Sequence, residues 1–451
     1  MEAAKDVLTR KGLKKTLSRN GRLLVEQKYN WKKLAERFHQ AIEDLQKPHV
    51  TVINDFPLLP PRHGGQYRIL SLYKNLSRYV PVHYLCLHKE SDEIETTGIS
   101  PGFMQKAIPK SLLQRVFESV LNRLMRTTID DILGIFFDHR NRLLKREIAQ
   151  AAAFGDILIV VHPYQWKTLS PHKKSIRIYE SLNYETLLKG ETLKGFMGQF
   201  FLFFVRRIER RAVVESSLVL SVSDEETEAF RSDFGLNGNA LTVPNGTDTT
   251  KIKPVSKGEK KKIRSYLGLP DCPIAIFIGS AHPPNVEAGF LLMNHIAPKT
   301  PEVLYFVIGS MCWILKNQSF CPPNVKLFFE LEEPARNELF KTADIAVNPM
   351  TMGAGTSLKM FDYLAAGLPV ISTALGARGI VHSEKDPIML CEIDEFPRAI
   401  RELCNSPERR EDYKERGRRF VEENFDWSSI AQKLYNELSR IYASHQNARS
   451  D

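Results

Sequence analysis

The sequence predicts an α/β protein made of two doubly wound, Rossmann-like domains that face a cleft. From residue 49 onward, short and nearly continuous apolar runs alternate with helical stretches, which is typical of parallel sheets covered on both faces. A polar, Lys-rich stretch at 251–271 interrupts this alternation, which then restarts. The chain of 451 residues is also too long for one ordinary core.

The composition narrows the class of protein. Hydrophobic residues make up 43% and charged residues 26%, which excludes disordered, collagenous and coiled-coil chains. The longest apolar run, 200–205, is far shorter than the ~20 residues that a membrane span needs. The 6 cysteines are scattered without a Cys-x-x-Cys pair, and no apolar leader is evident. We therefore expect a reduced, cytoplasmic protein without a secretory signal.

The predicted strands define the domains in order. For the N-terminal domain, residues 47–250, the expected strands are 49–56, 80–87, 156–163, 175–181, 218–223 and 240–246. For the C-terminal domain, residues 251–425, a linker and a surface helix precede strands at 274–280, 303–310, 325–331, 345–350, 369–375 and 388–393. A closing helix, 426–451, is expected to cross back to the N-terminal domain. Ligands of such sheets bind beyond the carboxyl ends of the strands.

Residues 1–46 form a separate basic segment that contains an internal repeat. Residues 1–47 hold 12 Lys and Arg against 6 Asp and Glu. Residues 21–42 match residues 417–438 at an offset of 396, sharing Gly, Arg, Val, Glu, Trp and Ala. We interpret the segment as the tail of a preceding unit of the same domain type, fused in tandem or split from it. Chance similarity of two amphipathic helices, or a helix lying on a membrane, are the alternatives.

The stretch 348–380 contains the sharpest candidate for a binding site. Gly353 and Gly355 follow a predicted strand and precede a helix, so backbone N–H groups are free to face an anion. Lys359 adds a positive charge suited to a diphosphate, and Asp362, three residues on along the same helical face, is placed to accept hydrogen bonds from a ribose diol. The alternative is a plain strand–loop–helix unit with the two side chains as a surface pair.

This stretch resembles retaining glycosyltransferases of the GT-B fold, family 4 type, in the subgroup with Gly-x-Gly-Thr-x-x-Lys followed by Asp or Glu. Further motifs of that family match in order: a glycine loop at 56–69, then 207–226, 242–248, 277–288 and 423–431. The resemblance covers about 49–440. It implies that a nucleotide-sugar donor binds mainly the C-terminal domain and that the acceptor binds the N-terminal domain.

The resemblance also implies roles for single residues. Asp362 would hold the ribose, and Lys359 would hold the diphosphate together with backbone N–H groups. His162, at a strand end, would lie near the donor sugar; a satisfied core histidine is the alternative. The implied binding residues are Gly64, Gly65, Gly353, Gly355, Thr356, Ser357, Leu358, Lys359 and Asp362, with His162 and Lys359 as the catalytic ones. Arg68 is expected to pair with an acidic acceptor group or with a partner helix.

Several positions depart from the family pattern. They are Ala354 in place of a sugar-contacting Glu, Gly279-Ser280 in place of Gly-Arg, and Glu180 and Leu182 in place of Asp and His, while Asn183 and Glu185 remain. No strand-end Asp-x-Asp occurs, so we expect neither a metal nor a cofactor beyond the donor substrate. Glu180 and Glu185 stay open as candidate nucleophiles.

The expected function is a retaining glycosyltransferase of cell-envelope polysaccharide or glycoconjugate synthesis, acting on a glycan or lipid-linked acceptor. A nucleotide-sugar epimerase of the same architecture and a non-catalytic domain of a tandem protein are the alternatives. The basic N-terminus and the aromatic, basic stretch 194–211 favour contact with the inner face of the membrane, whereas the alternative for 194–211 is a core helix. Expected partners are the donor, the acceptor and a second glycosyltransferase unit; no nucleic-acid motif occurs.

Overall fold

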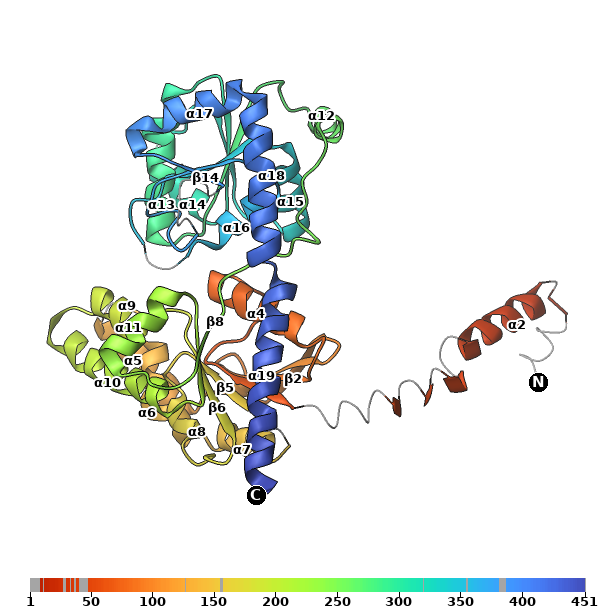
Figure 1. The fold of residues 1–451 in the computed structure, drawn as a ribbon, viewed down its shortest axis with the longest axis vertical. Helices are drawn as coiled ribbons and strands as arrows, with labels where there is room; N and C mark the ends of the chain where they lie inside the picture. Colours follow the sequence, from red (N-terminus) through yellow and green to blue (C-terminus); the bar gives the residue numbers. More distant parts are fainter. Residues whose placement is uncertain are drawn as a thin grey trace. The chain divides into compact units, whose positions relative to one another are not determined.

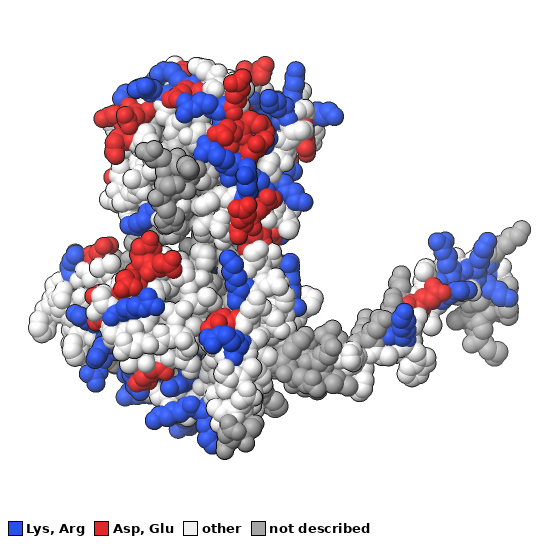
Figure 2. All heavy atoms as spheres, viewed as in Figure 1, with Lys and Arg blue, Asp and Glu red and all other residues white. Residues whose placement is uncertain are grey.

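The computed structural model divides into two compact units, Met1–His49 and Val50–Asp451. It describes residues 9–10, 12–26, 30–32, 34–35, 38–39, 48–125, 127–154, 157–318, 320–353, 356–380 and 387–450. In the first unit, helix α2 (Leu13–Leu24) buries none of its side chains, and Lys and Arg gather over it (Figure 2). Within the described residues, no helix is both long and apolar enough to cross a membrane.

The N-terminal domain of the second unit is built on an eight-stranded sheet (Figure 1). Its strands are β1 (Val50–Ile53), β2 (Val82–His88), β3 (Glu95–Ser100), β4 (Phe103–Pro109), β5 (Ile157–Val161), β6 (Ile176–Glu180), β7 (Leu218–Ser221) and β8 (Ala240–Thr242). They lie in the order β3-β4-β2-β1-β5-β6-β7-β8. All neighbours are parallel except the β3–β4 pair.

Helices cover both faces of this sheet, because its apolar strands expose side chains to two separate cores. The helices are α4 (Gly64–Leu76), α5 (Leu112–Met125), α6 (Asp130–Phe137), α7 (Arg142–Phe154), α8 (Trp166–Leu169), α9 (Glu185–Thr192), α10 (Gly195–Glu215) and α11 (Asp224–Phe234). Helix α4 packs in one core, and α6, α8, α10 and α11 contribute to the other.

The C-terminal domain has a six-stranded parallel sheet. Its strands are β9 (Ile274–Ile278), β10 (Leu304–Ile308), β11 (Val325–Phe328), β12 (Ile345–Asn348), β13 (Val370–Ser372) and β14 (Ile388–Leu390), in the order β11-β10-β9-β12-β13-β14. Its helices are α12 (Lys257–Tyr266), α13 (Pro283–Leu291), α14 (Met311–Gln318), α15 (Glu333–Thr342), α16 (Leu358–Ala365), α17 (Phe396–Asn405) and α18 (Pro407–Asn424). This strand order is that of the Rossmann fold.

The last helix, α19 (Trp427–Ser450), packs on the N-terminal domain beside α4 (Figure 1). Its buried side chains, Trp427, Ile430, Ala431, Leu434 and Leu438, belong to the same core as β1, β2 and α4. Asp426 lies at the junction, where its carboxylate accepts hydrogen bonds from the backbone N–H of Thr249 at 3.1 Å and of Ser428 at 2.9 Å. The polypeptide thus passes between the two sheets at 243–256 and again at 425–427.

The two Rossmann-like domains confirm the predicted fold class. All twelve expected strands are present at the expected places, and the Lys-rich stretch contains α12 as anticipated. Strands β3 and β4 were not anticipated. Strand β3 is mostly exposed at the sheet edge, and in β4 buried and less buried positions intermix, so neither is a continuous apolar run.

Candidate active site

Each sheet has one point where the direction of winding reverses, and the candidate residues gather at these two points. In the C-terminal sheet the reversal lies between β9 and β12, which are neighbours with helices α13 and α16 following them. In the N-terminal sheet it lies between β1 and β5. A crevice opens beyond the carboxyl ends of the strands at such a point, which makes it the usual ligand site of doubly wound sheets.

The glycine turn after β12 leads directly into α16. Gly353 has a φ of 119°, a conformation that glycine adopts without strain. Ser357 is the N-cap residue of α16, and its side chain makes no capping hydrogen bond. The first turn of the helix therefore keeps unsatisfied N–H groups available to an anion. Ala354 and Gly355, the latter one of the expected anion-binding residues, lie outside the described residues.

Lys359 reaches across the reversal point of the C-terminal sheet. Its ammonium donates a hydrogen bond to Oδ1 of Asn285 on α13 at 2.8 Å and lies 4.4 Å from the centre of the Phe277 ring on β9. No carboxylate pairs with it in the described part of the chain, and burial lowers the pKa of Lys359 to about 7. A half-buried cation whose partners among the described residues are an amide oxygen and a ring can accept an anionic ligand.

Asp362 has its own partners and does not pair with Lys359. Its Oδ1 accepts a 2.6 Å hydrogen bond from Oγ1 of Thr247 in the crossover, and Arg336 on α15 lies 3.7 Å from Oδ2. Burial raises the pKa of Asp362, and the charge of Arg336 and the hydrogen bond from Thr247 offset part of that rise. The alternative of a Lys359–Asp362 surface pair is therefore wrong; the role in ribose binding stays a prediction.

His162 ends β5 at the reversal point of the N-terminal sheet. Its backbone adopts a φ of 63°, which is uncommon for a residue with a side chain, and residues in such conformations cluster at active sites and ligand-binding sites. Its Nδ1 lies 3.0 Å from Oε1 of Glu185, and Oε2 of the same carboxylate accepts a 2.5 Å hydrogen bond from the Tyr164 hydroxyl. Burial by itself would lower the pKa of His162, but the hydrogen bond and the charge of Glu185 outweigh it and raise that pKa.

The glycine loop after β1 brings the two domains into contact. Gly64 begins α4, and a Cβ at this position would lie 3.1 Å from Cδ1 of Leu358, the first residue of α16. A Cβ at Gly65 would instead lie 3.3 Å from His63 and 3.6 Å from Leu182, both in the N-terminal domain. The N-termini of two helices thus approach each other through one glycine and one leucine, next to the predicted anion site.

A pocket of about 330 Å³ opens between the domains beside this contact. The N-terminal domain contributes α9, α11 and Leu182 and Asn183; the C-terminal domain contributes Thr356, Arg378 and Gly379. Arg378 donates a 3.0 Å hydrogen bond to the carbonyl of Gly353, which ties the glycine turn to the pocket wall. Of the expected binding residues, Thr356 lines this pocket directly.

Two expectations about charged residues of the N-terminal domain are wrong. Arg68 is buried and donates to the carbonyl of Val243 at 2.7 Å and to Oδ1 of Asn245 at 3.0 Å, so it holds the crossover and faces neither an acceptor nor another helix. Glu180 is fully buried, 3.5 Å from Arg68, and accepts a 2.5 Å hydrogen bond from Tyr73. A carboxylate enclosed in this way cannot act as a nucleophile.

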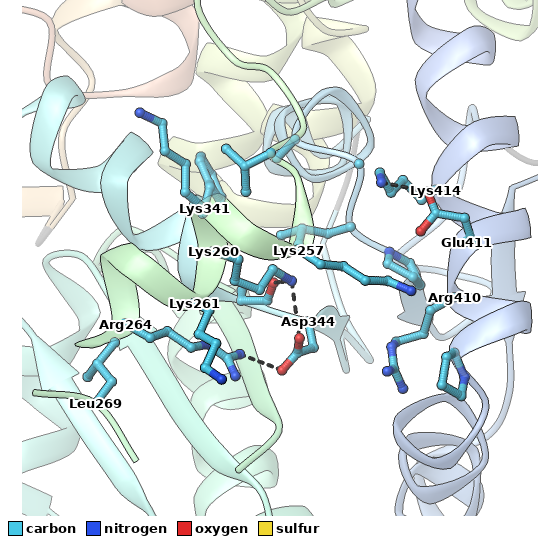
Figure 3. A pocket seen from close by; sticks show the side chains of 18 of the residues that line it. Lys257, Lys260, Lys261, Arg264, Leu269, Lys341, Asp344, Arg410, Glu411 and Lys414 are labelled. Atoms are coloured by element: carbon cyan, nitrogen blue, oxygen red, sulfur yellow. Dashed lines mark hydrogen bonds and ion pairs between the residues drawn. The ribbon is translucent and has the colours of Figure 1, made fainter. Parts of the chain in front are cut away.

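A larger pocket, of about 470 Å³, lies on the C-terminal domain and is rich in lysine and arginine (Figure 3). Lys260 and Arg264 both point at Asp344, at 3.1 and 2.5 Å, and also bind main-chain carbonyls (Figure 3). Because these cations already have partners, and because neither Lys359 nor Asp362 lines the pocket, we do not assign the active site to it.

Sequence reasoning missed the neighbours of the two key side chains. Asn285, Phe277 and Arg378 were not singled out, and neither was Arg336 beside Asp362. One signal was present: Asn285 belongs to the helix that follows the first strand of the C-terminal domain, and in this fold that helix faces the one that follows the fourth strand. The approach of Arg336 depends on packing between helices and has no sequence pattern.

One family model and two curated proteins match part of the chain in sequence. Residues 272–406 match the family model of glycosyl transferases group 1. The GDP-mannose-dependent monoacylated alpha-(1-6)-phosphatidylinositol monomannoside mannosyltransferase of Corynebacterium glutamicum is 24% identical over 252 residues, or 52% of this chain and 65% of that protein. Spore coat protein SA of Bacillus subtilis is 23% identical over 240 residues, 48% of this chain and 63% of that protein. The matches thus span somewhat less than two thirds of these relatives.

Solved structures resemble nearly the whole chain. Sucrose-phosphate synthase from Thermosynechococcus elongatus superimposes with a TM-score of 0.65 at 14% identity, covering 88% of this chain and 100% of that one. HepE of Anabaena in complex with UDP-glucose gives a TM-score of 0.61 at 14% identity, covering 87% and 100%. Residues 272–406 thus match a glycosyl transferases group 1 domain, and the solved structures share the two-domain fold of this chain.

Proposed function

We propose that this chain, whose residues 272–406 form a glycosyl transferases group 1 domain, is a retaining glycosyltransferase that moves a sugar from a nucleoside-diphosphate sugar to a glycan or lipid-linked acceptor. The observation that carries the proposal is Lys359, a half-buried cation at the N-terminal turn of α16 that has no carboxylate partner among the residues the structure describes. A diphosphate at this turn would supply the missing negative charge.

The proposed reaction breaks the bond between the anomeric carbon and the diphosphate oxygen, and the electron pair leaves with the diphosphate. Lys359 and the N–H groups at the start of α16 would stabilise the charge that grows there, and one such donor contributes about 10²-fold to the rate. The acceptor oxygen forms the new bond from the same face of the sugar, and its proton passes to the departing phosphate. Asp362 would hold the ribose of the donor.

His162 is the proposed sugar-facing residue of the N-terminal domain. It lies at the reversal point of its sheet, with its ring 6.3 Å from that of Phe56 in the glycine loop. Since Glu185 holds the imidazole through Nδ1, Nε2 is left to meet the substrate. The relatives support this class of donor: one is named as GDP-mannose-dependent, and one solved structure holds UDP-glucose.

Nucleotide binding tests the proposal most directly. We would measure thermal shifts with UDP, GDP, ADP and their sugars for the wild-type chain and for Asp362→Asn, which keeps an oxygen for Thr247. One nucleotide should raise the Tm of the wild type and should do so much less in the variant. Lys257→Met, in the larger pocket, is the matched control and should respond like the wild type. Equal shifts in the wild type and Asp362→Asn would contradict the assigned site.

Product analysis separates the transferase from the alternatives. With the nucleotide that binds, the proposed enzyme releases a free nucleoside diphosphate only when acceptor is present. An isomerised nucleotide-sugar formed without acceptor would identify an epimerase. A chain that binds no nucleotide and yields neither product would be the non-catalytic domain.

The acceptor side of the proposal includes contact with a cytoplasmic membrane face. Helices α5 and α10 both pack on α6 and expose a row of large apolar side chains: Leu112, Leu113, Val116, Phe117, Val120, Leu124, Phe196, Phe200 and Phe203. The exposed fraction of Phe196 reaches 90%. Exposed cations, including Arg206, Arg207 and Arg210, continue along α10 and suit anionic lipid.

The predicted core role of 194–211 accounts for one face of α10 only. Phe201, Val205 and Ile208 are buried, whereas Phe196 and Phe200 are exposed. We expect the full chain to float with anionic vesicles and Phe196→Ser/Phe200→Ser to float much less. Equal flotation of both, with vesicles of the same composition, would contradict the membrane contact.

A further inference from the structure

The N-terminal unit repeats two hydrogen bonds of the junction between α18 and α19. Nε of Arg22 donates to Oε1 of Glu26 at 2.7 Å, as Nε of Arg418 does to Oε1 of Glu422 at 2.7 Å. Past each helix end an Asx side chain accepts from the backbone N–H two residues on: Asn30 from Lys32 at 2.8 Å and Asp426 from Ser428 at 2.9 Å. The repeat at 21–42 and 417–438 thus shares two local hydrogen bonds between its described residues, in addition to its sequence.

In its C-terminal copy, the repeated helix packs into the core of the N-terminal domain. Trp427, Ile430, Ala431 and Leu434 are all buried in the N-terminal core beside α4. The preceding turn is held as well, since the Nη groups of Arg418 donate to three carbonyls, those of Thr249, Ile252 and Ala365, at 2.6–2.7 Å. We call this combination of apolar groove and carbonyls the closing-helix seat.

The equivalent side chains of the first unit have no such seat around them. Trp31 corresponds to Trp427 and is 85% exposed, and Phe38 corresponds to Leu434 and is 70% exposed. The side chain of Arg22, the counterpart of Arg418, is 81% exposed. The apolar pattern and the arginine that complete a two-domain unit are thus present a second time, and the closing-helix seat seen in the described residues is already filled by α19.

We propose that residues 12–42 are a docking element for a second chain or domain pair of the same GT-B architecture, one whose own closing-helix seat is open. Trp31, Leu34 and Phe38 would enter the apolar groove beside its first helix, and Arg22 would bind its crossover carbonyls. The proposed partner of this segment is a glycosyltransferase-like unit. A second copy of this chain is the weaker occupant, because docking there has to displace a covalently attached α19. The inference depends on the fold and on the repeat, and not on the proposed activity.

A graft tests whether the segment fits such a seat. In the full chain, residues 417–438 are replaced by the sequence of 21–42; the control graft has the same composition, with Trp31, Leu34 and Phe38 exchanged for the neighbouring Lys32, Lys33 and Arg37. We expect the first graft to unfold cooperatively, with Tm lower by no more than ~10 °C, and the control to lose cooperative unfolding. Equal behaviour of the two grafts would overturn the proposal.

A binding experiment tests docking in trans. Trp427→Ala/Leu434→Ala opens the seat of the full chain, and Trp31→Ser in the same chain keeps its own segment out. A synthetic peptide of residues 12–42 should raise the Tm of this variant by several degrees and leave the wild type unchanged. A peptide with Trp31→Ser and Phe38→Ser should have no effect. If the triple variant does not fold, the graft alone decides; a folded variant that ignores the peptide overturns the proposal.

Two further outcomes would assign the segment to another partner. A wild-type dimer in light scattering that Trp31→Ser converts to a monomer would make a second copy the occupant. Flotation on anionic vesicles that is lost on removal of residues 1–46, but kept in Phe196→Ser/Phe200→Ser, would make it a membrane anchor. Either result overturns the proposal that the segment docks to a second unit. A monomeric wild type whose flotation does not need residues 1–46 supports the proposal.

Discussion

Lys359 combines its proposed binding role with a cost in stability. Burial lowers its pKa to about 7 from an ordinary 10.5, so between these values the unfolded chain holds a proton that the folded chain lacks. Stability therefore rises with pH across that window, and the charged form is unfavourable in the free protein at pH 7 and below. Lys359→Met removes the unfavourable charge while keeping an apolar stem of similar length.

We expect Lys359→Met to raise the Tm of the free protein at pH 6.5 and to weaken nucleoside-diphosphate binding by about 10- to 100-fold, the range of one charge-assisted hydrogen bond. In the wild type, affinity should fall as pH rises above about 7, by at most about tenfold per pH unit for a single proton. Calorimetry at pH 6.5 and 8.5 measures both effects. Unchanged affinity in the variant would remove Lys359 from the diphosphate site.

Glu185 sets the protonation of His162. Because the carboxylate raises the pKa of the imidazole, Glu185→Gln should move that pKa downward. A raised histidine pKa contributes stability below its unfolded value of 6.5, and this contribution disappears as pH rises through the folded pKa. The loss of Tm in Glu185→Gln should accordingly be larger at pH 6 than at pH 8.5.

Histidine signals in an NMR titration report the pKa directly. Glu191→Gln, an exposed change near the end of the same helix, serves as the control and should leave the His162 titration unchanged. A His162 pKa that is the same in Glu185→Gln and in the wild type would show that another group controls the imidazole.

At the scale of single residues, the sequence predicted the candidate site side chains better than the residues that contact them. Lys359, Asp362 and His162 all lie at the reversal points of the two sheets, where the pattern of strands places them. Arg68 and Glu180 were misjudged, because their burial comes from the crossover folding over α4 and β6. Contacts between segments that are far apart in the chain leave no local pattern to recognise.

At the scale of elements, the junction before α19 depends on one carboxylate. Asp426 accepts from Ser428 at the start of the helix and from both the N–H and the hydroxyl of Thr249, so it ties the closing helix to the crossover. Burial alone would raise the pKa of Asp426, but these hydrogen bonds outweigh it and lower that pKa. Its stabilising effect is therefore present above pH ~4 and is lost as pH falls through the folded pKa.

We expect Asp426→Ala to lower the free energy of unfolding by about 2–4 kcal/mol, since it removes a helix cap and leaves Thr249 unsatisfied. Urea unfolding at pH 7 and at pH 3.5 measures this loss, which should shrink at the lower pH. Asn30→Ala removes the equivalent cap in the N-terminal unit and is the matched control; it should leave the unfolding of residues 50–451 unchanged. Equal effects of the two substitutions would contradict the role of Asp426.

The sequence pattern is sufficient to recognise the buried strands but not the edge strand. A strand buried on both faces is a continuous apolar run, so β1, β5, β9 and β10 were recognisable without any structure. The edge strand β3 exposes most of its side chains and has no such pattern. Its pairing with β4 is antiparallel, a local hairpin added to a parallel sheet.

At the scale of the whole molecule, the proposed site requires the two domains to meet. Lys359 and Asp362 belong to the C-terminal domain and His162 to the N-terminal one, and Gly64 lies against Leu358 near them. The alternation of strands predicted both domains and the edges at which ligands bind. This alternation does not show which residues touch between the two domains, because those contacts depend on the path of the crossover and of α19.

A side chain at Gly64 would disturb the contact between the two domains. A Cβ there would lie 3.1 Å from Leu358, and the two further methyl groups of valine have to displace that side chain or separate the domains. Nucleotide binding, assigned to the C-terminal domain, should persist in Gly64→Val, while sugar transfer should fall at least ~10-fold because donor and acceptor residues no longer align. Gly64→Val/Leu358→Ala should recover much of the loss, because the smaller side chain at 358 makes room for the valine. Nucleotide affinity and transfer rate are measured on the wild type and on these two variants. A Gly64→Val enzyme with a wild-type rate would show that this contact does not set the alignment of the domains.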